Sequence, residues 1–427
     1  VTDATHGAIE GDFVTISSVS GTANGITASN LQGEFEIQSV TDTNNYVITA
    51  KAAATGTGAS GVTGTAEYQI NTNPAFSIQG YGWGAGTWGL STWGTTRAGL
   101  ASPDSVQLDS GKWSLDNWGE DVLCQQLNGG LYYWDTSAST STVQRAVSST
   151  VSNAPTSSRF VLVSGTDRHV ICFGTETTIG TATTRDDMFI RWSDQENVNE
   201  WAPTATNTAG SQRLTDGSKL VTAKRSRGAV LIWSDTALYQ MSLIGAPFVF
   251  GFQQLGSACG CIGQHAAVES NGRSFWMGID SFFAFDGSVQ KIPCSVEDYV
   301  FKDIDQASQK DTFAGLNTEF NEVTWFYCSN GSNVINRCVT FNYQENVWSV
   351  GSLARSSWAD KGVYGFPYAL DYSSTDTTAT ISTITGLTAG RSYMYAQENG
   401  NDADGSALAS HVTSGDFVIP EAGERLM

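Results

Sequence analysis

The most conspicuous candidate for a chemical site is a glycine pattern at 84–89. The run GAGTWG matches the GxGxxG pattern of dinucleotide-binding proteins. That pattern binds a pyrophosphate only where it follows a strand and opens a helix, because the free amides of the helix must meet the phosphates. The residues that follow, 90–95, have no helical period, and glycine and tryptophan recur throughout 80–94. We therefore expect no nucleotide cofactor. An aromatic loop that packs on a neighbouring surface is the better interpretation.

Carboxylates are the second candidates, because propeller-shaped hydrolases cleave glycosidic bonds with paired acids in a central funnel. Asp194, Asp235 and Asp286 each stand where an expected strand gives way to a turn, a place where aspartate hydrogen-bonds its own backbone. We predict turn roles for these three and no catalytic residue in the chain. The complete set of acids considered is Asp194, Asp235, Asp280, Asp286 and Glu322.

Metal-binding patterns are incomplete. The run 401–405, NDADG, has the beginning of a calcium loop, but 406–408 supply no further oxygen ligands, so a polar hairpin is favoured. The seven cysteines include no CxxC pair, and Cys259 and Cys261 are the only two that lie close together. We expect no metal and no cofactor, with reduced, buried thiols that suit assembly inside a cell. We also expect structural roles for the scattered histidines, His6, His169, His265 and His411.

Composition predicts an all-β chain. The 427 residues include 45 Gly and 13 Trp, and only 15 % are charged, which is typical of many short strands joined by tight turns. The net charge of −20 argues against sequence-specific nucleic-acid binding, which needs lysine and arginine against phosphate. The one basic run, 224–227, is interpreted as a solvated turn before a strand. No apolar stretch is long enough to span a membrane, and we expect the chain to be a piece of a longer polypeptide.

Two regions differ in pattern. Residues 1–75 contain no Trp and show short alternating runs at 12–16, 34–37 and 46–49, which predict a small β-sandwich-like module at the N-terminus or inserted into the main body. Residues 76–427 repeat apolar and aromatic strands and predict a β-propeller-like body that is incomplete at its C-terminal end. One helix is expected from Val296 to about Gln309, capped by Ser295.

Tryptophans mark the expected repeat of the body. Trp192, Trp233, Trp276 and Trp325 end or occupy similar apolar strands and are 41, 43 and 49 residues apart. Periods of about 40 to 50 residues are typical of propeller blades of four strands each. The sequence therefore predicts about five visible blades.

Seven segments of the body resemble the stabilisation and tail-nozzle proteins of short-tailed bacteriophages. The resemblance covers roughly 160–420, and its order and spacing are more specific than any single motif. It implies a non-enzymatic β-propeller subunit of the virion tail, assembled in the host cytoplasm into a sixfold ring. Its partners would be copies of itself, the portal, the adaptor and other tail proteins, with double-stranded DNA passing through the lumen without sequence-specific binding. The segments are 191–201, 231–241, 247–256, 276–287, 293–301, 321–327 and 341–351.

Two other functions remain open from the sequence. A secreted or surface propeller that binds or cleaves glycans would pair its cysteines and bring two carboxylates together in a funnel. A receptor-binding tail fibre or adhesin would favour trimers and long, slender repeats over compact blades. The oligomeric state separates these alternatives from the nozzle.

Overall fold

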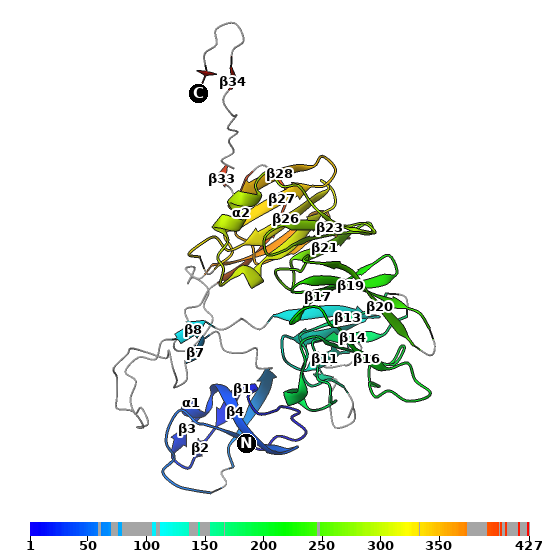
Figure 1. Ribbon diagram of the computed structural model, residues 1–427. Coiled ribbons are helices and arrows are strands. Elements are labelled where there is room, and N and C mark those ends of the chain that lie inside the picture. Colours follow the sequence, from blue (N-terminus) through cyan, green and yellow to red (C-terminus); the bar gives the residue numbers. More distant parts are fainter. Residues whose placement is uncertain are drawn as a thin grey trace, which may run out of the picture.

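The computed structural model consists almost entirely of β-strands (Figure 1). In the described part of the chain, helix is confined to two α-helices and two short 3-10 turns, α1 (Ala28–Leu31), α2 (Glu297–Asp303), η1 (Ala182–Thr184) and η2 (Gln309–Asp311). The predicted all-β class is therefore confirmed. The structure describes residues 1–58, 61–69, 76–78, 105–107, 112–135, 144–145, 154–165, 167–245, 248–332, 334–373, 391–400, 402–403, 406–407, 417–418 and 425–426.

Residues 1–69 build a small sheet with its own core. Four antiparallel strands lie in the order β5-β4-β1-β6, beside a two-stranded ribbon, β2-β3. Alternate residues of these strands point inward and form a core of Val14, Phe35, Ile37 and Tyr46, as the predicted alternation requires. The expected boundary at residue 75 lies outside the described residues. The strands are β1 (Phe13–Ser20), β2 (Thr22–Ala23), β3 (Ile26–Thr27), β4 (Gly33–Asp42), β5 (Asn45–Ile48) and β6 (Thr63–Gln69).

The body contains five four-stranded antiparallel sheets in its described part, each with its strands in chain order. Such meanders are the blades of a β-propeller-like fold. Their strands are β9 (Trp113–Trp118), β10 (Asp121–Gln126), β11 (Leu131–Trp134), β12 (Gln144–Arg145); β13 (Phe160–Val163), β14 (Val170–Phe173), β15 (Phe189–Trp192), β16 (Gly210–Arg213); β17 (Leu220–Ser226), β18 (Ala229–Ser234), β19 (Ala237–Leu243), β20 (Phe250–Ser257); β21 (Ala267–Ser270), β22 (Arg273–Met277), β23 (Phe282–Phe285), β24 (Val289–Lys291); β25 (Phe313–Asn317), β26 (Glu322–Tyr327), β27 (Arg337–Asn342), β28 (Val347–Gly351).

Three further strands form a smaller sheet that packs on the fifth blade. Trp358 lies over Gly315 of β25, where a Cβ atom would come within 2.6 Å of the indole ring. The Trp358 Nε1 donates to the Leu316 carbonyl at 2.9 Å. Glycine at 315 is therefore what allows this close approach. The sheet is β29 (Ser357–Ala359), β30 (Tyr368–Ser373) and β31 (Arg391–Ala396); the remaining short strands are β7 (Phe76–Ile78), β8 (Ser105–Gln107), β32 (Asp402–Ala403), β33 (Ser406–Ala407), β34 (Phe417–Val418) and β35 (Arg425–Leu426).

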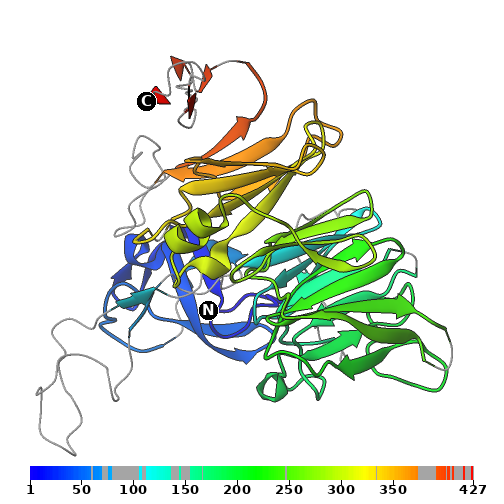
Figure 2. The ribbon, with the colours of Figure 1, turned by 45° about the horizontal axis from the view of Figure 1, so that its top comes forward.

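The blades follow one another in space as they do in sequence. Figure 2 shows the later ones side by side in the order of their colours, from green through yellow-green and yellow to orange. The first strands of consecutive sheets lie next to each other, β9 by β13, β13 by β17, β17 by β21 and β21 by β25. These first strands are therefore the innermost ones, and the space that they share is the axis of the fan.

Buried indoles fill the gaps between the third, fourth and fifth blades. Trp233, Trp276 and Trp325 are fully buried in one continuous core. The rings of Trp233 and Trp276 meet edge to face at 5.3 Å, and the ring of Trp325 packs on Phe282 at 4.9 Å. These three residues lie on the second strands β18, β22 and β26, so the spacings of 43 and 49 residues join equivalent positions.

The fourth predicted marker, Trp192, is not equivalent to the other three. It ends β15, the third strand of its blade, whereas the second strand β14 carries no Trp. The spacing of 41 residues from Trp192 to Trp233 is therefore not a blade-to-blade repeat. At this blade the corresponding core is filled by Phe173, whose ring stacks on Phe160 at 4.6 Å.

The predicted helix exists but is shorter than expected. α2 ends at Asp303, and its N-cap is Val296 with no side-chain hydrogen bond, so Ser295 does not cap it. Glu297 and Asp298 in the first turn and Lys302 in the last suit the helix dipole. Val300 is the one fully buried residue of the helix, and the partly buried Phe301 also packs on the core, with its ring 5.3 Å from that of Phe282.

Candidate functional site

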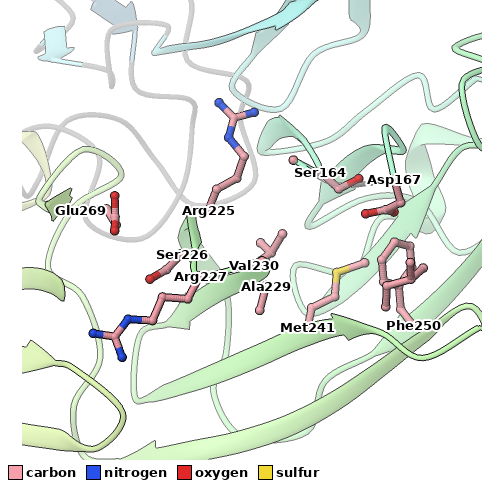
Figure 3. Close-up of a pocket in the computed structure, with 13 residues that line it drawn as sticks. Ser164, Asp167, Arg225, Ser226, Arg227, Ala229, Val230, Met241, Phe250 and Glu269 are labelled. Carbon is pink, nitrogen blue, oxygen red and sulfur yellow. The ribbon is translucent and has the colours of Figure 1, made fainter. Parts of the chain in front are cut away.

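The innermost strands of all five blades line a common pocket of about 400 Å³ on the axis. A second pocket of about 270 Å³ adjoins it at the end of β17 and shares two residues with it, Arg225 and Glu269 (Figure 3). The axial pocket is lined by Ser114, Leu115, Asp116, Phe160, Val161, Leu162, Thr222, Ala223, Lys224, Arg225, Gln264, His265, Val268, Glu269 and Leu316.

The basic run 224–227 supplies the positive charge of this pocket. The prediction that it forms a turn is wrong for Lys224, Arg225 and Ser226, which belong to β17 and pair with β18. The turn comes one residue later, where Arg227 and Gly228 have φ values of 47° and 78°. Strand geometry sends alternate side chains to opposite sides, so Lys224 and Arg225 face different neighbours.

Arg225 joins three blades through one carboxylate. Its Nη1 and Nη2 donate to the two oxygens of Asp116 on β9 at 2.8 and 3.0 Å, and its Nη1 also donates to the Val163 carbonyl at 2.8 Å. The Val163 amide donates to Asp116 Oδ2 at 2.7 Å. A buried carboxylate held by a bidentate arginine and a backbone amide is strongly satisfied, so Asp116 has little capacity left for another cation.

The side chain of Lys224 lies on the opposite side of β17 from that of Arg225, and His265 belongs to the lining of the same pocket. Enclosure by the pocket walls lowers the pKa of Lys224, and the charge of Arg225 acts in the same direction. Enclosure also lowers the pKa of His265 to about 4, helped by the charges of Lys224 and Lys112. The imidazole is exposed to the water of the axial pocket, and with this lowered pKa it is neutral at pH 7.

Lys112 and His265 connect the fifth blade to the first and to the fourth. The Lys112 Nζ pairs with Asp311 at 2.8 Å and so ties the start of β9 to the segment before β25. The His265 carbonyl accepts from the Ala314 amide at 2.8 Å and so joins the start of β21 to β25. Sequence reasoning assigned His265 a structural role and did not place it in a pocket, because nothing in its neighbourhood in the sequence indicates the axis.

The carboxylates considered for catalysis do not meet. The exposed Asp286 remains at a turn, next to Gly287. Burial acts to raise the pKa of Asp194 and of Asp235, but hydrogen bonds from Thr208 and from Ser218 respectively hold both below the usual value. Asp194 and Asp235 stand at the turns where they were predicted, but they accept hydrogen bonds from segments 14 and 17 residues away. None of the five, Asp194, Asp235, Asp280, Asp286 and Glu322, lines either pocket described above.

His169 forms hydrogen bonds with an acid on one side and a hydroxyl on the other. Its Nδ1 lies 2.5 Å from Asp167 Oδ2, and its Nε2 lies 2.9 Å from Thr208 Oγ1. The order acid, imidazole, hydroxyl is that of a nucleophile relay. However, the Thr208 hydroxyl donates to Asp194 at 2.7 Å and accepts from the Gln195 amide at 2.9 Å. The hydrogen bonds of Thr208 thus stabilise the turn at Asp194 and Gln195, which supports the structural role predicted for His169.

The seven thiols are unpaired, and six of them are buried. Burial raises the pKa of Cys172 and of Cys261 to about 12, so both are protonated at pH 7. Burial likewise raises the pKa of Cys259, the neighbour of Cys261 in the sequence. These are the properties of packed, unreactive thiols.

Within the described residues, no three His, Cys, Asp or Glu side chains come close enough together to hold a metal ion. The helices of the described part are all too short or too polar to cross a membrane. Of the two other sequence patterns, for which no ligand is expected, the glycine pattern 84–89 lies outside the described residues. In the run 401–405 only Asp402 and Ala403 are described, as strand β32.

Comparison with known proteins finds distant structural similarity only. No family profile and no curated protein matches the sequence. The computationally designed Ika8 protein is 10 % identical, with a TM-score of 0.36 over 62 % of this chain and 70 % of that one. An apocarotenoid oxygenase mutant from Synechocystis is 9 % identical (TM-score 0.34; 60 % and 64 % covered), and BamB from Moraxella catarrhalis is 14 % identical (TM-score 0.32; 62 % and 81 % covered). Similarity at this level does not extend to function.

Proposed function

We propose that this protein is a structural, non-enzymatic subunit of a bacteriophage tail. Copies of the chain would form a sixfold nozzle ring below the portal and adaptor. The ring would help to close the filled head and would provide the channel through which DNA leaves.

The observation that carries this proposal is where the segments of the family resemblance lie. Segment 231–241 lies within the β18–β19 hairpin, 276–287 runs from the end of β22 through β23, and 341–351 runs from the end of β27 through β28. These hairpins hold Trp233, Trp276 and their neighbours, which pack one blade on the next. These three segments therefore include strands of the body that pack one blade on the next, which supports a shared architecture.

The chemistry of the described residues also favours a structural role. A glycan-cleaving propeller would need two carboxylates facing each other across a funnel. The axial pocket contains Asp116 and Glu269, but Asp116 is held by Arg225, and Glu269 Oε1 accepts from the Gly272 amide at 2.5 Å. Both acids have structural partners.

Charge is compatible with a channel for DNA. Six copies at −20 each give a ring of about −120, and acidic residues along the lumen would repel phosphate and keep the leaving DNA from adhering. A reconstruction of the ring with a lumen lined by lysine and arginine would contradict this part of the proposal.

The oligomer provides the direct test. We expect purified protein at about ten micromolar to give sixfold rings in negative-stain images, with a mass of six 45.5-kDa chains in mass photometry. In parallel, the same sample is incubated with a panel of glycans, and we expect no cleavage. A stable monomer at this concentration, or turnover of a glycan, would overturn the proposal.

A further inference from the structure

The axial pocket contains hydrogen-bond donors that the described residues leave unused. The ammonium of Lys224 makes no hydrogen bond or ion pair with any described residue, although the side chain is half-buried against the pocket wall. The Nε2 of Gln264, also in the pocket lining, is a buried donor without an acceptor in the described part. The buried Gln264 amide without an acceptor costs free energy, and the half-buried Lys224 in the same lining adds a charged donor without a protein acceptor, so together they suit an anionic ligand.

The acids of the pocket do not neutralise these donors. Asp116 is occupied on the other side of β17 by Arg225 and the Val163 amide. Glu269 turns one oxygen to the Gly272 amide. No described acid forms an ion pair with Lys224, although the charge of Asp116 acts to raise its pKa.

We propose that the axial pocket binds a small oxyanion of the phosphate class, with the Lys224 ammonium and the Gln264 amide as its donors. Such an ion has several acceptor oxygens, which suit a pocket whose lining contains N–H groups without acceptors. A volume of about 400 Å³ holds the ion and several waters, at about 30 Å³ for each water. The pocket lies between the strands of a single chain, so the ligand is a small ion and not a DNA strand.

Isothermal titration with sodium phosphate at pH 7.5, against a chloride background of equal ionic strength, tests the proposal. We expect saturable binding of one phosphate per chain, with sulfate as a competitor. Lys224→Met keeps the length of the side chain and removes its charge, and it should weaken binding at least about tenfold, because charge-assisted hydrogen bonds are the stronger ones. Gln264→Leu should weaken binding about threefold or more.

Lys219→Met is the matched control. Lys219 is exposed just before β17, five residues from Lys224, so its substitution changes the net charge equally and should leave the affinity unchanged. Thermal unfolding in chloride checks the fold, and Lys224→Met should be at least as stable as the wild type, because it removes an enclosed charge. Added phosphate should raise the Tm of the wild type and not that of Lys224→Met.

Three results would overturn the proposal: no saturable binding up to about 50 mM phosphate, equal affinity in Lys224→Met, or an equal loss in Lys219→Met. If Lys224→Met fails to fold, Gln264→Leu decides, and unchanged affinity in that variant counts against the site. The titration counts ions per chain in any oligomeric state, so its outcome is separate from that of the ring experiment.

Discussion

The blades of the body and the N-terminal module obtain their stability in different ways. Blades three to five share one core, in which Trp233, Trp276 and Trp325 are fully buried between sheets. The module has one small core on one face of one sheet, built around Ile37 and Tyr46. Between described residues, no hydrogen bond or ion pair joins 1–69 to 112–400.

This difference determines how far a local change spreads. An indole between two blades belongs to the packing of both, and burying its 150 to 250 Å² contributes roughly 4 to 6 kcal/mol at about 25 cal/mol per Å². The core side chains of the module, in contrast, pack against one another. We therefore expect blade substitutions to lower the stability of the whole body and module substitutions to act locally.

Truncation of Trp276 should have the largest effect. Trp276→Ala removes the edge contact with Trp233 and the hydrogen bond from Nε1 to the Cys259 carbonyl, 2.8 Å long. We expect the free energy of unfolding of the body to fall by about 3 to 5 kcal/mol in urea titrations followed by tryptophan fluorescence.

Leu115→Ala is the control, because Leu115 is 65 % exposed on β9 and should change stability by no more than about 0.5 kcal/mol. If Trp276→Ala melted only one blade and left the remaining fluorescence transition in place, the idea of a shared core would be wrong.

The same indoles show how far the fold could be predicted. Aromatic strands at blade spacing identified the β-class and the repeat, because filling the space between sheets needs large rings at equivalent positions. The repeat failed at Trp192, because β14 meets the same need with Phe173 and so leaves no Trp to count. The space between two blades must be filled by a large side chain, but this need not be tryptophan. A search for tryptophan alone therefore selected Trp192 on β15 in place of Phe173 on β14.

Ile37→Ala tests the same comparison in the N-terminal module. Ile37 is fully buried in the module, and its truncation should cost about 2 to 4 kcal/mol. Because the module core is separate, we expect hydrogen exchange to rise in 1–69 only, while the tryptophan fluorescence transition of the body stays unchanged; the sequence places no Trp in 1–69. A shift of the fluorescence transition would show that the module and the body unfold together.

Asp116→Ala tests a polar connection between blades instead of an apolar one. The substitution leaves the Val163 amide without its acceptor and Arg225 without its carboxylate. We expect a loss of about 1 to 3 kcal/mol in the same urea titration, less than for Trp276, because Arg225 is 47 % exposed and water can solvate it. Asp298→Ala removes an exposed ion pair on α2 and is the control, with no measurable change expected. A loss as large as that of Trp276→Ala would show that polar connections matter as much as the indoles.

The axial pocket could not be predicted from the sequence. Asp116 and Arg225 are 109 residues apart, and only the order of the blades brings them together. The basic run 224–227 looked like a solvated turn, because a strand edge that faces an enclosed axis has the same local composition as one that faces solvent. The positions of Asp194 and Asp235 at turns could be predicted from the residues next to them, but their partners Thr208 and Ser218, 14 and 17 residues away, could not.

His265 gives the smallest expected effect, and it depends on pH. Its pKa is about 4 in the folded protein and about 6.5 in an unfolded chain. As pH falls below 6.5 the unfolded state takes up the proton first, so stability falls between pH 6.5 and about 4 and this contribution is then constant. His265→Asn removes the effect. Urea midpoints at pH 7.5 should be similar for the two proteins, and the drop from pH 7.5 to 4.5 should be smaller for the variant. An equal drop would mean that the lining of the axial pocket does not lower the pKa of the His265 imidazole. The axial pocket would then be as open to water as the outer surface of the blades.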